Sequence, residues 1–74
     1  MPSTPDFYSS NLKILRQKLN MSQSALARAI GITPAMISLY ESGKRKPSYQ
    51  TVAKIVKIAK AYRIDINMEY IRTE

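Results

Sequence analysis

The chain has 74 residues and a formal net charge of +7, with 45% hydrophobic residues, 23% charged residues and two glycines. A chain of that length can form one modest hydrophobic core, which excludes a multi-step enzyme with a deep pocket of its own. The composition is typical of a folded, mostly helical domain. Cysteine and histidine are both absent, which excludes disulfides and the usual zinc sites, so we predict no metal, no cofactor and no catalytic residue.

The positive charge is concentrated in the second half of the chain. Between Ser42 and Arg63 there is no acidic residue, and the cations there are Lys44, Arg45, Lys46, Lys54, Lys57, Lys60 and Arg63. Such a surface attracts polyanions, so nucleic acid and an anionic membrane surface are candidate partners, and a solvated lysine face is the alternative. The longest uncharged run, residues 29–40, is too short to span a membrane, and the first residues lack the pattern of a secretory signal. We therefore expect a cytoplasmic protein.

The first predicted elements are a tail and a helix. Residues 1–8 are polar and rich in proline, and we expect them to form a flexible tail. A helix is expected to begin at Ser9 or Ser10, either of which can cap it, and to end at Asn20, which tolerates a left-handed backbone. Its buried stripe is formed by Leu12, Leu15 and Leu19.

Two short helices joined by a tight turn are predicted next. Ser22 can cap a helix over residues 23–30, and Gly31 ends it. Thr33 followed by proline can cap a third helix that runs to about Glu41, because proline at the first helical position loses no hydrogen bond.

A basic loop over residues 44–47 leads to a fourth helix, capped by Ser48. Its apolar stripe has helical spacing and consists of Val52, Ile55, Val56, Ala59 and Tyr62. Beyond it, residues 64–72 alternate apolar and polar side chains, which predicts a β-strand. The alternative is a short fifth helix capped by Asn67 that buries Met68 and Ile71.

Residues Gln23 to Ser42 satisfy the position rules of a helix-turn-helix motif. Counting Gln23 as position 1, the motif needs apolar residues at positions 4, 8, 10, 15 and 18, a small residue at 5 and a turn residue at 9. The corresponding residues are Leu26, Ile30, Ile32, Ile37, Tyr40, Ala27 and Gly31. Each is uninformative alone, but together they predict a motif that places a helix in the major groove.

The run from Met21 to Ser48, together with Arg16, resembles the Cro/repressor-type (XRE, lambda-repressor-like) family. It includes the Glu-x-Gly-Lys-x-x-Pro-Ser sequence that begins at Glu41, and the resemblance extends from about Leu12 to Tyr62. It implies an all-α, four-helix DNA-binding domain over residues 9–63, in which Arg16 pairs with Glu41 and holds the third helix on the scaffold.

The resemblance also implies which residues contact DNA. Base edges would be read by Thr33, Pro34, Ala35, Ser38 and Leu39, and phosphates would be held by Ser22, Gln23, Ser42, Lys44, Arg45 and Lys46. The reading face carries no Gln, Asn or Arg, so bidentate readout of purines is not available from it. Hydroxyl hydrogen bonds, contacts to thymine methyl groups and DNA shape remain as sources of specificity.

A lone strand over residues 64–72 would leave backbone groups unpaired on an exposed edge. We therefore expect residues 64–74 to form a dimerisation segment that pairs antiparallel with a second copy. The expected dimer interface consists of Ile64, Ile66, Met68 and Tyr70. A homodimer would place two reading helices about 34 Å apart and select a pseudo-palindromic operator.

These observations predict a sequence-specific transcriptional regulator, most simply a repressor, that binds double-stranded DNA as a homodimer. One alternative is the antitoxin of a toxin-antitoxin pair, which binds a toxin and represses its own operon. Another is RNA binding or general coating of nucleic acid, which the basic loop alone would allow. An enzyme with a small-molecule substrate is disfavoured, because the acidic residues form no evident pair.

Overall fold

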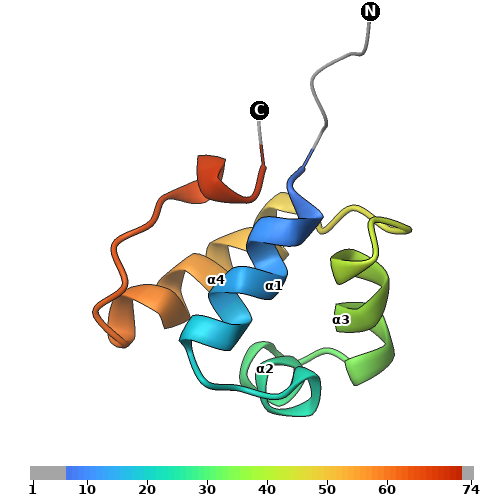
Figure 1. Ribbon diagram of the computed structural model, residues 1–74, viewed down its shortest axis with the longest axis horizontal. Coiled ribbons are helices and arrows are strands. Elements are labelled where there is room, and N and C mark those ends of the chain that lie inside the picture. The colour runs from blue at the N-terminus through green and yellow to red at the C-terminus, as the bar shows by residue number, and fades with distance from the viewer. Residues whose placement is uncertain (1–6, 73–74) are drawn as a thin grey trace, which may run out of the picture.

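The computed structural model describes residues 7–72. Its elements are α1 (Ser9–Lys18), α2 (Gln23–Ile30), α3 (Pro34–Glu41), α4 (Tyr49–Ala61) and a 3-10 helix, η1 (Met68–Tyr70). Figure 1 shows α1 in the centre, with α3 on one side of it and α4 on the other. The predicted all-α, four-helix class is confirmed.

Side-chain caps define the starts of three helices. Ser22, Thr33 and Ser48 each accept a hydrogen bond from the backbone amide three residues later, at 3.0, 3.3 and 3.2 Å respectively. Such caps satisfy amides that lack a partner within the helix. The expected serine cap of α1 is wrong, because Tyr8 occupies the N-cap position without a side-chain bond and Ser9 is already helical.

Left-handed residues define the turns on either side of α2. Asn20 has a φ of 57° before α2, and Gly31 has a φ of 78° after it. Because Gly31 has no Cβ, it adopts this backbone without a steric penalty, and the chain reverses into α3 within three residues. Asn20 and Gly31 thus act as the sequence predicted.

One apolar core lies between the helices. Its buried members are Leu12, Leu15, Leu19, Leu26, Ala27, Ile30, Ile37, Tyr40, Val52, Ile55, Val56, Ala59 and Ile71. The stripe expected on α4 is buried except for Tyr62, which is 57% exposed. That assignment was wrong because α4 ends at Ala61, and Arg63 then turns the chain away with a φ of 62°.

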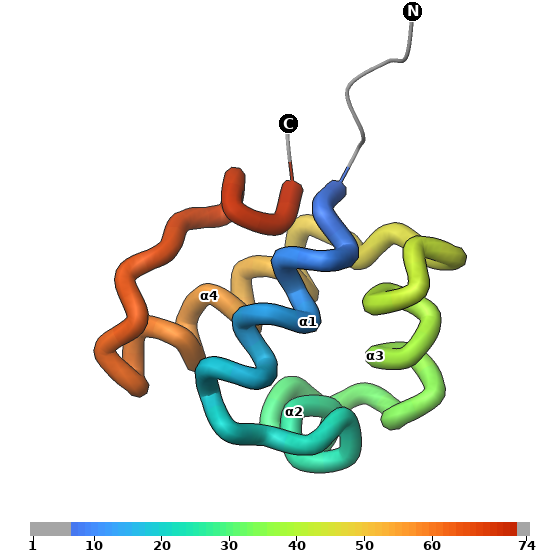
Figure 2. Tube along the Cα trace, in the orientation of Figure 1, coloured from blue at the N-terminus to red at the C-terminus, as the bar shows by residue number. Residues whose placement is uncertain are grey.

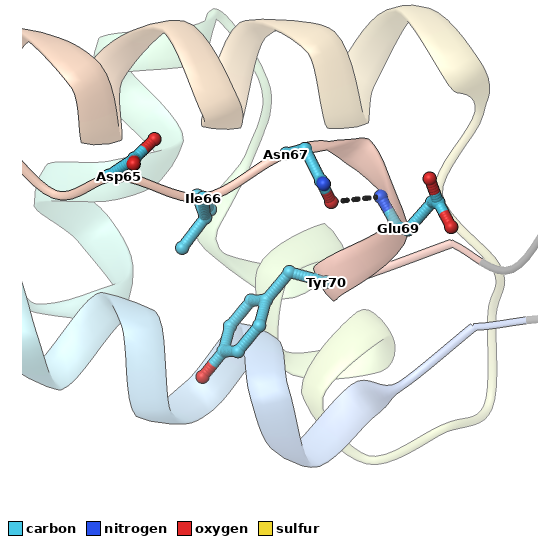
Figure 3. Close-up of a pocket in the computed structure, with 5 residues that line it drawn as sticks. All are labelled: Asp65, Ile66, Asn67, Glu69 and Tyr70. Carbon is cyan, nitrogen blue, oxygen red and sulfur yellow. Dashed lines mark hydrogen bonds between the residues drawn. The ribbon is translucent and has the colours of Figure 1, made fainter.

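Residues 64–72, which we call the C-terminal strap, do not form the predicted strand. Within residues 7–72 the β-type pairing is a single isolated bridge between Phe7 and Arg72. The strap is extended to Asn67, whose side chain accepts a hydrogen bond from the Glu69 amide at 3.0 Å and starts η1 (Figure 3). The alternative of a short capped helix was therefore closer to the structure.

The strap folds back over its own domain, as the tube in Figure 2 shows. The Tyr8 amide donates to the Ile71 carbonyl at 2.7 Å, and the Asn11 side chain donates to the Tyr70 carbonyl at 2.9 Å. Ile71 is fully buried. A partner strand is thus not needed here, because the end of the strap is hydrogen-bonded within the chain.

Part of the predicted tail belongs to this arrangement. Residues 1–6 lie outside the described residues, whereas Phe7 and Tyr8 pair with the end of the strap. Among the described helices, none has both the length and the apolar character that crossing a membrane requires.

Candidate nucleic-acid interface

Helix α3 has one buried face and one exposed face. Ile37 and Tyr40 are 0% and 5% exposed, which fixes the inner face on the core. The residues predicted to read bases lie outside this contact: Thr33, Pro34, Ala35 and Ser38 are exposed, and Leu39 is half-buried. Pro34 to Leu39 occupy the first six positions of the helix, and its amino-terminal end is the part that contacts bases in helix-turn-helix complexes.

A polar network holds the end of α3 against α1 and α2. Arg16 donates from Nε to Glu41 Oε2 at 2.5 Å and from Nη2 to Glu41 Oε1 at 3.0 Å. Gln23 Nε2 donates to the same Oε1 at 3.2 Å, and Arg16 Nη1 donates to the Met21 carbonyl at 2.9 Å. One arginine therefore joins the carboxyl end of α3 to α1 and to the turn before α2.

The network is largely shielded from water. The side chains of Arg16 and Glu41 are only 13% and 5% exposed. The hydrogen bond to Glu41 raises the pKa of Arg16, and the Coulomb attraction of the same carboxylate adds to this effect while burial opposes it. Such a bidentate, shielded pair is stronger than an exposed ion pair, which contributes only about 0–1 kcal/mol.

Two of the residues expected to hold phosphates, Gln23 and Ser42, line an open hollow beside this network, whereas Ser22, Lys44, Arg45 and Lys46 do not. The hollow is lined by Lys13, Arg16, Gln23, Ser38, Glu41 and Ser42. It joins the amino-terminal end of α2, which favours anions, to the exposed face of α3. Sequence reasoning missed Lys13, although it lies one helical turn before Arg16 and therefore on the same side of α1.

The basic loop after α3 is held in place by backbone hydrogen bonds. The amides of Lys44 and Arg45 donate to the Leu39 carbonyl at 3.0 and 3.3 Å, and Gly43 makes the turn with a φ of 79°. Lys44 and Arg45 are exposed, whereas Lys46 is half-buried. The loop therefore exposes two of its three cations beside α3.

The carboxyl end of the loop is fixed by the strap. Pro47 is fully buried, and its carbonyl accepts a hydrogen bond from Arg72 Nη1 at 3.1 Å. Nothing in the local sequence indicates this contact, because the two residues are 25 positions apart. The four predicted dimer residues, Ile64, Ile66, Met68 and Tyr70, are half-buried and pack against the core of their own chain.

This surface presents hydroxyls, small apolar groups and cations, without a metal-binding cluster. Within the part of the chain that the structure describes, no group of three or more acidic, cysteine or histidine side chains is placed to hold a metal ion. Such a surface can bind a polyanion along the loop and contact base edges through α3.

Comparison with known sequences supports this interpretation. A sequence model of the helix-turn-helix family matches residues 12–67. An uncharacterised HTH-type transcriptional regulator of Archaeoglobus fulgidus is 51% identical over 45 residues, which are 61% of this chain and 20% of that protein. The HTH-type transcriptional regulator YqaE of Bacillus subtilis is 33% identical over 64 residues, which are 86% of this chain and 51% of the relative. This chain therefore spans about a fifth and about half of the length of these two relatives.

A second Archaeoglobus fulgidus HTH-type transcriptional regulator is closer in size, with 35% identity over 57 residues that cover 77% of this chain and 80% of the relative. Among solved structures, the P22 c2 repressor in complex with a synthetic operator is similar with a TM-score of 0.72 and 21% identity. That match covers 84% of this chain and 86% of the repressor chain. At this identity the similarity shows a shared fold.

Proposed function

The chain belongs to the Cro/repressor-type (XRE, lambda-repressor-like) helix-turn-helix family, and on that premise we propose that it is a sequence-specific DNA-binding repressor. Helix α3 enters the major groove of an operator and the loop after it holds the flanking phosphates. The main support for this proposal is that α3 has one buried face and one exposed face. Ile37 and Tyr40 anchor the inner face in the core. Thr33, Ala35 and Ser38 remain exposed on the outer side. Bound DNA would block access of polymerase to the promoter.

Selection of bound sites from a random duplex library tests the proposal. A specific regulator enriches one site, whereas a protein that merely coats nucleic acid enriches none. Ser38→Ala removes the hydroxyl at the centre of the reading face and is expected to change the selected bases while leaving affinity for random duplex unchanged. Loss of a single hydrogen bond of this kind lowers discrimination at one position by roughly tenfold. An identical site preference for wild type and Ser38→Ala would contradict the proposed reading role.

The basic loop contributes affinity rather than sequence preference. Lys44→Ala and Arg45→Ala are each expected to weaken binding to every duplex. Each should also reduce, by about one, the steepness with which the logarithm of the association constant falls with the logarithm of the salt concentration. Lys18→Ala, which removes an exposed lysine from α1, is the matched control and should leave the slope unchanged. Titrations at several salt concentrations measure this slope. Equal slopes for wild type, the two loop variants and the Lys18→Ala control would contradict the proposed phosphate contacts.

The repressor acts as a homodimer through the outer side of the strap, without strand pairing. The predicted interface residues Ile64, Ile66, Met68 and Tyr70 stay only half-buried. Tyr62 beside them is 57% exposed, so apolar surface remains there for a second copy. Sedimentation of the whole chain should show a dimer. Tyr70→Ser should raise its dissociation constant at least about tenfold, since interface tyrosines often contribute more than 1 kcal/mol.

The matched control for the dimer is Tyr49→Ser, because Tyr49 is 61% exposed at the other end of α4. It removes the same side chain from the amino-terminal end of α4, which contains none of the predicted dimer residues. A wild-type monomer at high concentration, or an equal effect of the two tyrosine variants, would rule out a dimer through the strap.

A further inference from the structure

We propose that the outer face of α4 binds the phosphate backbone of a second DNA segment, so that one protomer joins two duplexes. The proposal rests on the proposed function, because α3 and the basic loop must already hold the first duplex. The α4 face consists of Lys54, Lys57 and Lys60, with Arg63 at its end.

All four cations of this face are exposed, and within residues 7–72 no carboxylate forms an ion pair with them. Asp65 is the acidic residue near the end of the row, where it lines a hollow with Lys60 and Arg63. The charge of the three lysines is therefore not neutralised within the domain. Charge of this kind is available to a polyanion, whose bound counterions are released when lysines replace them.

The spacing of the lysines suits an extended line of phosphates. Lys54, Lys57 and Lys60 lie three residues apart, so the row is about 9 Å long at 1.5 Å per residue. A duplex carries one charge per about 1.7 Å of its axis, so a row of this length faces several phosphates. Lys54 and Lys57 also border an open hollow whose other lining residues are Ala29 of α2, Ile58 and Ala61.

Helix α4 lies apart from the helix proposed to read DNA. In Figure 1, α1 lies between α3 and the carboxyl-terminal half of α4, which carries Lys57 and Lys60, while Lys54 lies near the middle of the helix. Helix α2 packs against both α3 and α4, whereas α3 is not packed extensively on α4. A straight duplex seated on α3 therefore leaves the α4 lysines free, and their partner is a different segment.

The chemistry of the face favours nucleic acid over an acidic protein. Lysine is depleted at protein-protein interfaces, where aromatic residues and arginine are enriched. Here three lysines dominate, and the apolar side chains beside them, Ala29, Ile58 and Ala61, line only an open hollow. Lysine is a flexible point charge that follows phosphates without demanding a fixed geometry.

A two-duplex capture assay tests the proposal. A duplex that carries the site selected from the library is fixed to beads and saturated with protein, and a labelled random-sequence duplex is then added. Wild type should retain the second duplex. The triple variant Lys54→Gln, Lys57→Gln, Lys60→Gln should bind the first duplex within about threefold of wild type, yet capture the second about two orders of magnitude more weakly at about 0.1 M salt.

Single-charge variants provide the matched comparison, with Lys57→Gln reducing capture and Lys18→Gln leaving it unchanged. Capture retained by the triple variant, or reduced equally by Lys18→Gln, would overturn the proposal. So would α4-dependent binding of polyglutamate without capture of the second duplex, since that result identifies an acidic protein as the partner. Failure of the library to yield a site would reject the proposed function, whereas a bound first duplex without a captured second one rejects only this inference.

Discussion

Arg16→Ala is expected to destabilise the domain by about 2 kcal/mol and to lower its melting temperature by roughly 10 °C. The substitution removes the bidentate partner of Glu41 and leaves a carboxylate that is 5% exposed with Gln23 as its remaining side-chain donor. It also removes the hydrogen bond to the Met21 carbonyl in the turn before α2. Thermal unfolding measured by circular dichroism gives the change.

Two further variants separate the ion pair from a general effect of losing charge. Arg16→Lys keeps the positive charge but loses the planar guanidinium group that bonds both carboxylate oxygens, so an intermediate loss of stability is expected. Lys18→Ala removes an exposed cation from the same helix and should stay within about 0.5 kcal/mol of wild type. A double-mutant cycle of Arg16→Ala with Glu41→Ala must then show coupling, and strictly additive losses would mean that the pair contributes nothing.

Ile71→Ala is expected to cost about 3 kcal/mol of stability, which is the size of a core deletion. Ile71 is 0% exposed and is the one buried residue that the strap contributes to the core. Its loss should also loosen the Tyr8 and Arg72 hydrogen bonds, because these lie beside it in the chain. Chemical denaturation measures the effect.

Ile14→Ala is the matched control, since it deletes the same atoms from a position that is 42% exposed. A change within about 0.5 kcal/mol is expected there. If the two isoleucine variants lost equal stability, the docking of the strap would be of no energetic consequence. A large loss for Ile71→Ala alone would establish the strap as part of the folded domain.

The helices and their turns were predictable because their signals are local. Ser22, Thr33 and Ser48 each act on the backbone three residues ahead, and Gly31 needs only its own conformational freedom. Periodicity identified the buried stripes of α1 to α4 for the same reason, since each stripe follows from helical geometry alone.

The strap was not predictable in this way, because its conformation depends on distant residues. The alternation of residues 64–70 has the period of a strand, yet the segment packs on the core of its own chain and turns into η1 at Asn67. Tyr62 was misassigned because helical spacing continues in the sequence after α4 has ended. Short segments of this kind are decided by tertiary contacts, which outweigh local propensity.

The candidate interface was only partly predictable. The family resemblance indicated the positions of α3 that face outward, whereas the bond from Gln23 to Glu41 and the place of Lys13 in the hollow required the structure. Lys46 shows the limit of reading charge from sequence, because it is half-buried while its neighbours Lys44 and Arg45 are exposed.

The contact between the two ends of the domain has a consequence for how the protein folds. The bond from Asn11 to the Tyr70 carbonyl joins residues 59 positions apart, and closing a loop of that length costs on the order of 3–4 kcal/mol of chain entropy. Helices α1 to α4 can therefore assemble first, with the strap docking late. In native-state hydrogen exchange, the first turn of α1 and the end of the strap should open as one unit, at a lower free energy than the helices between them.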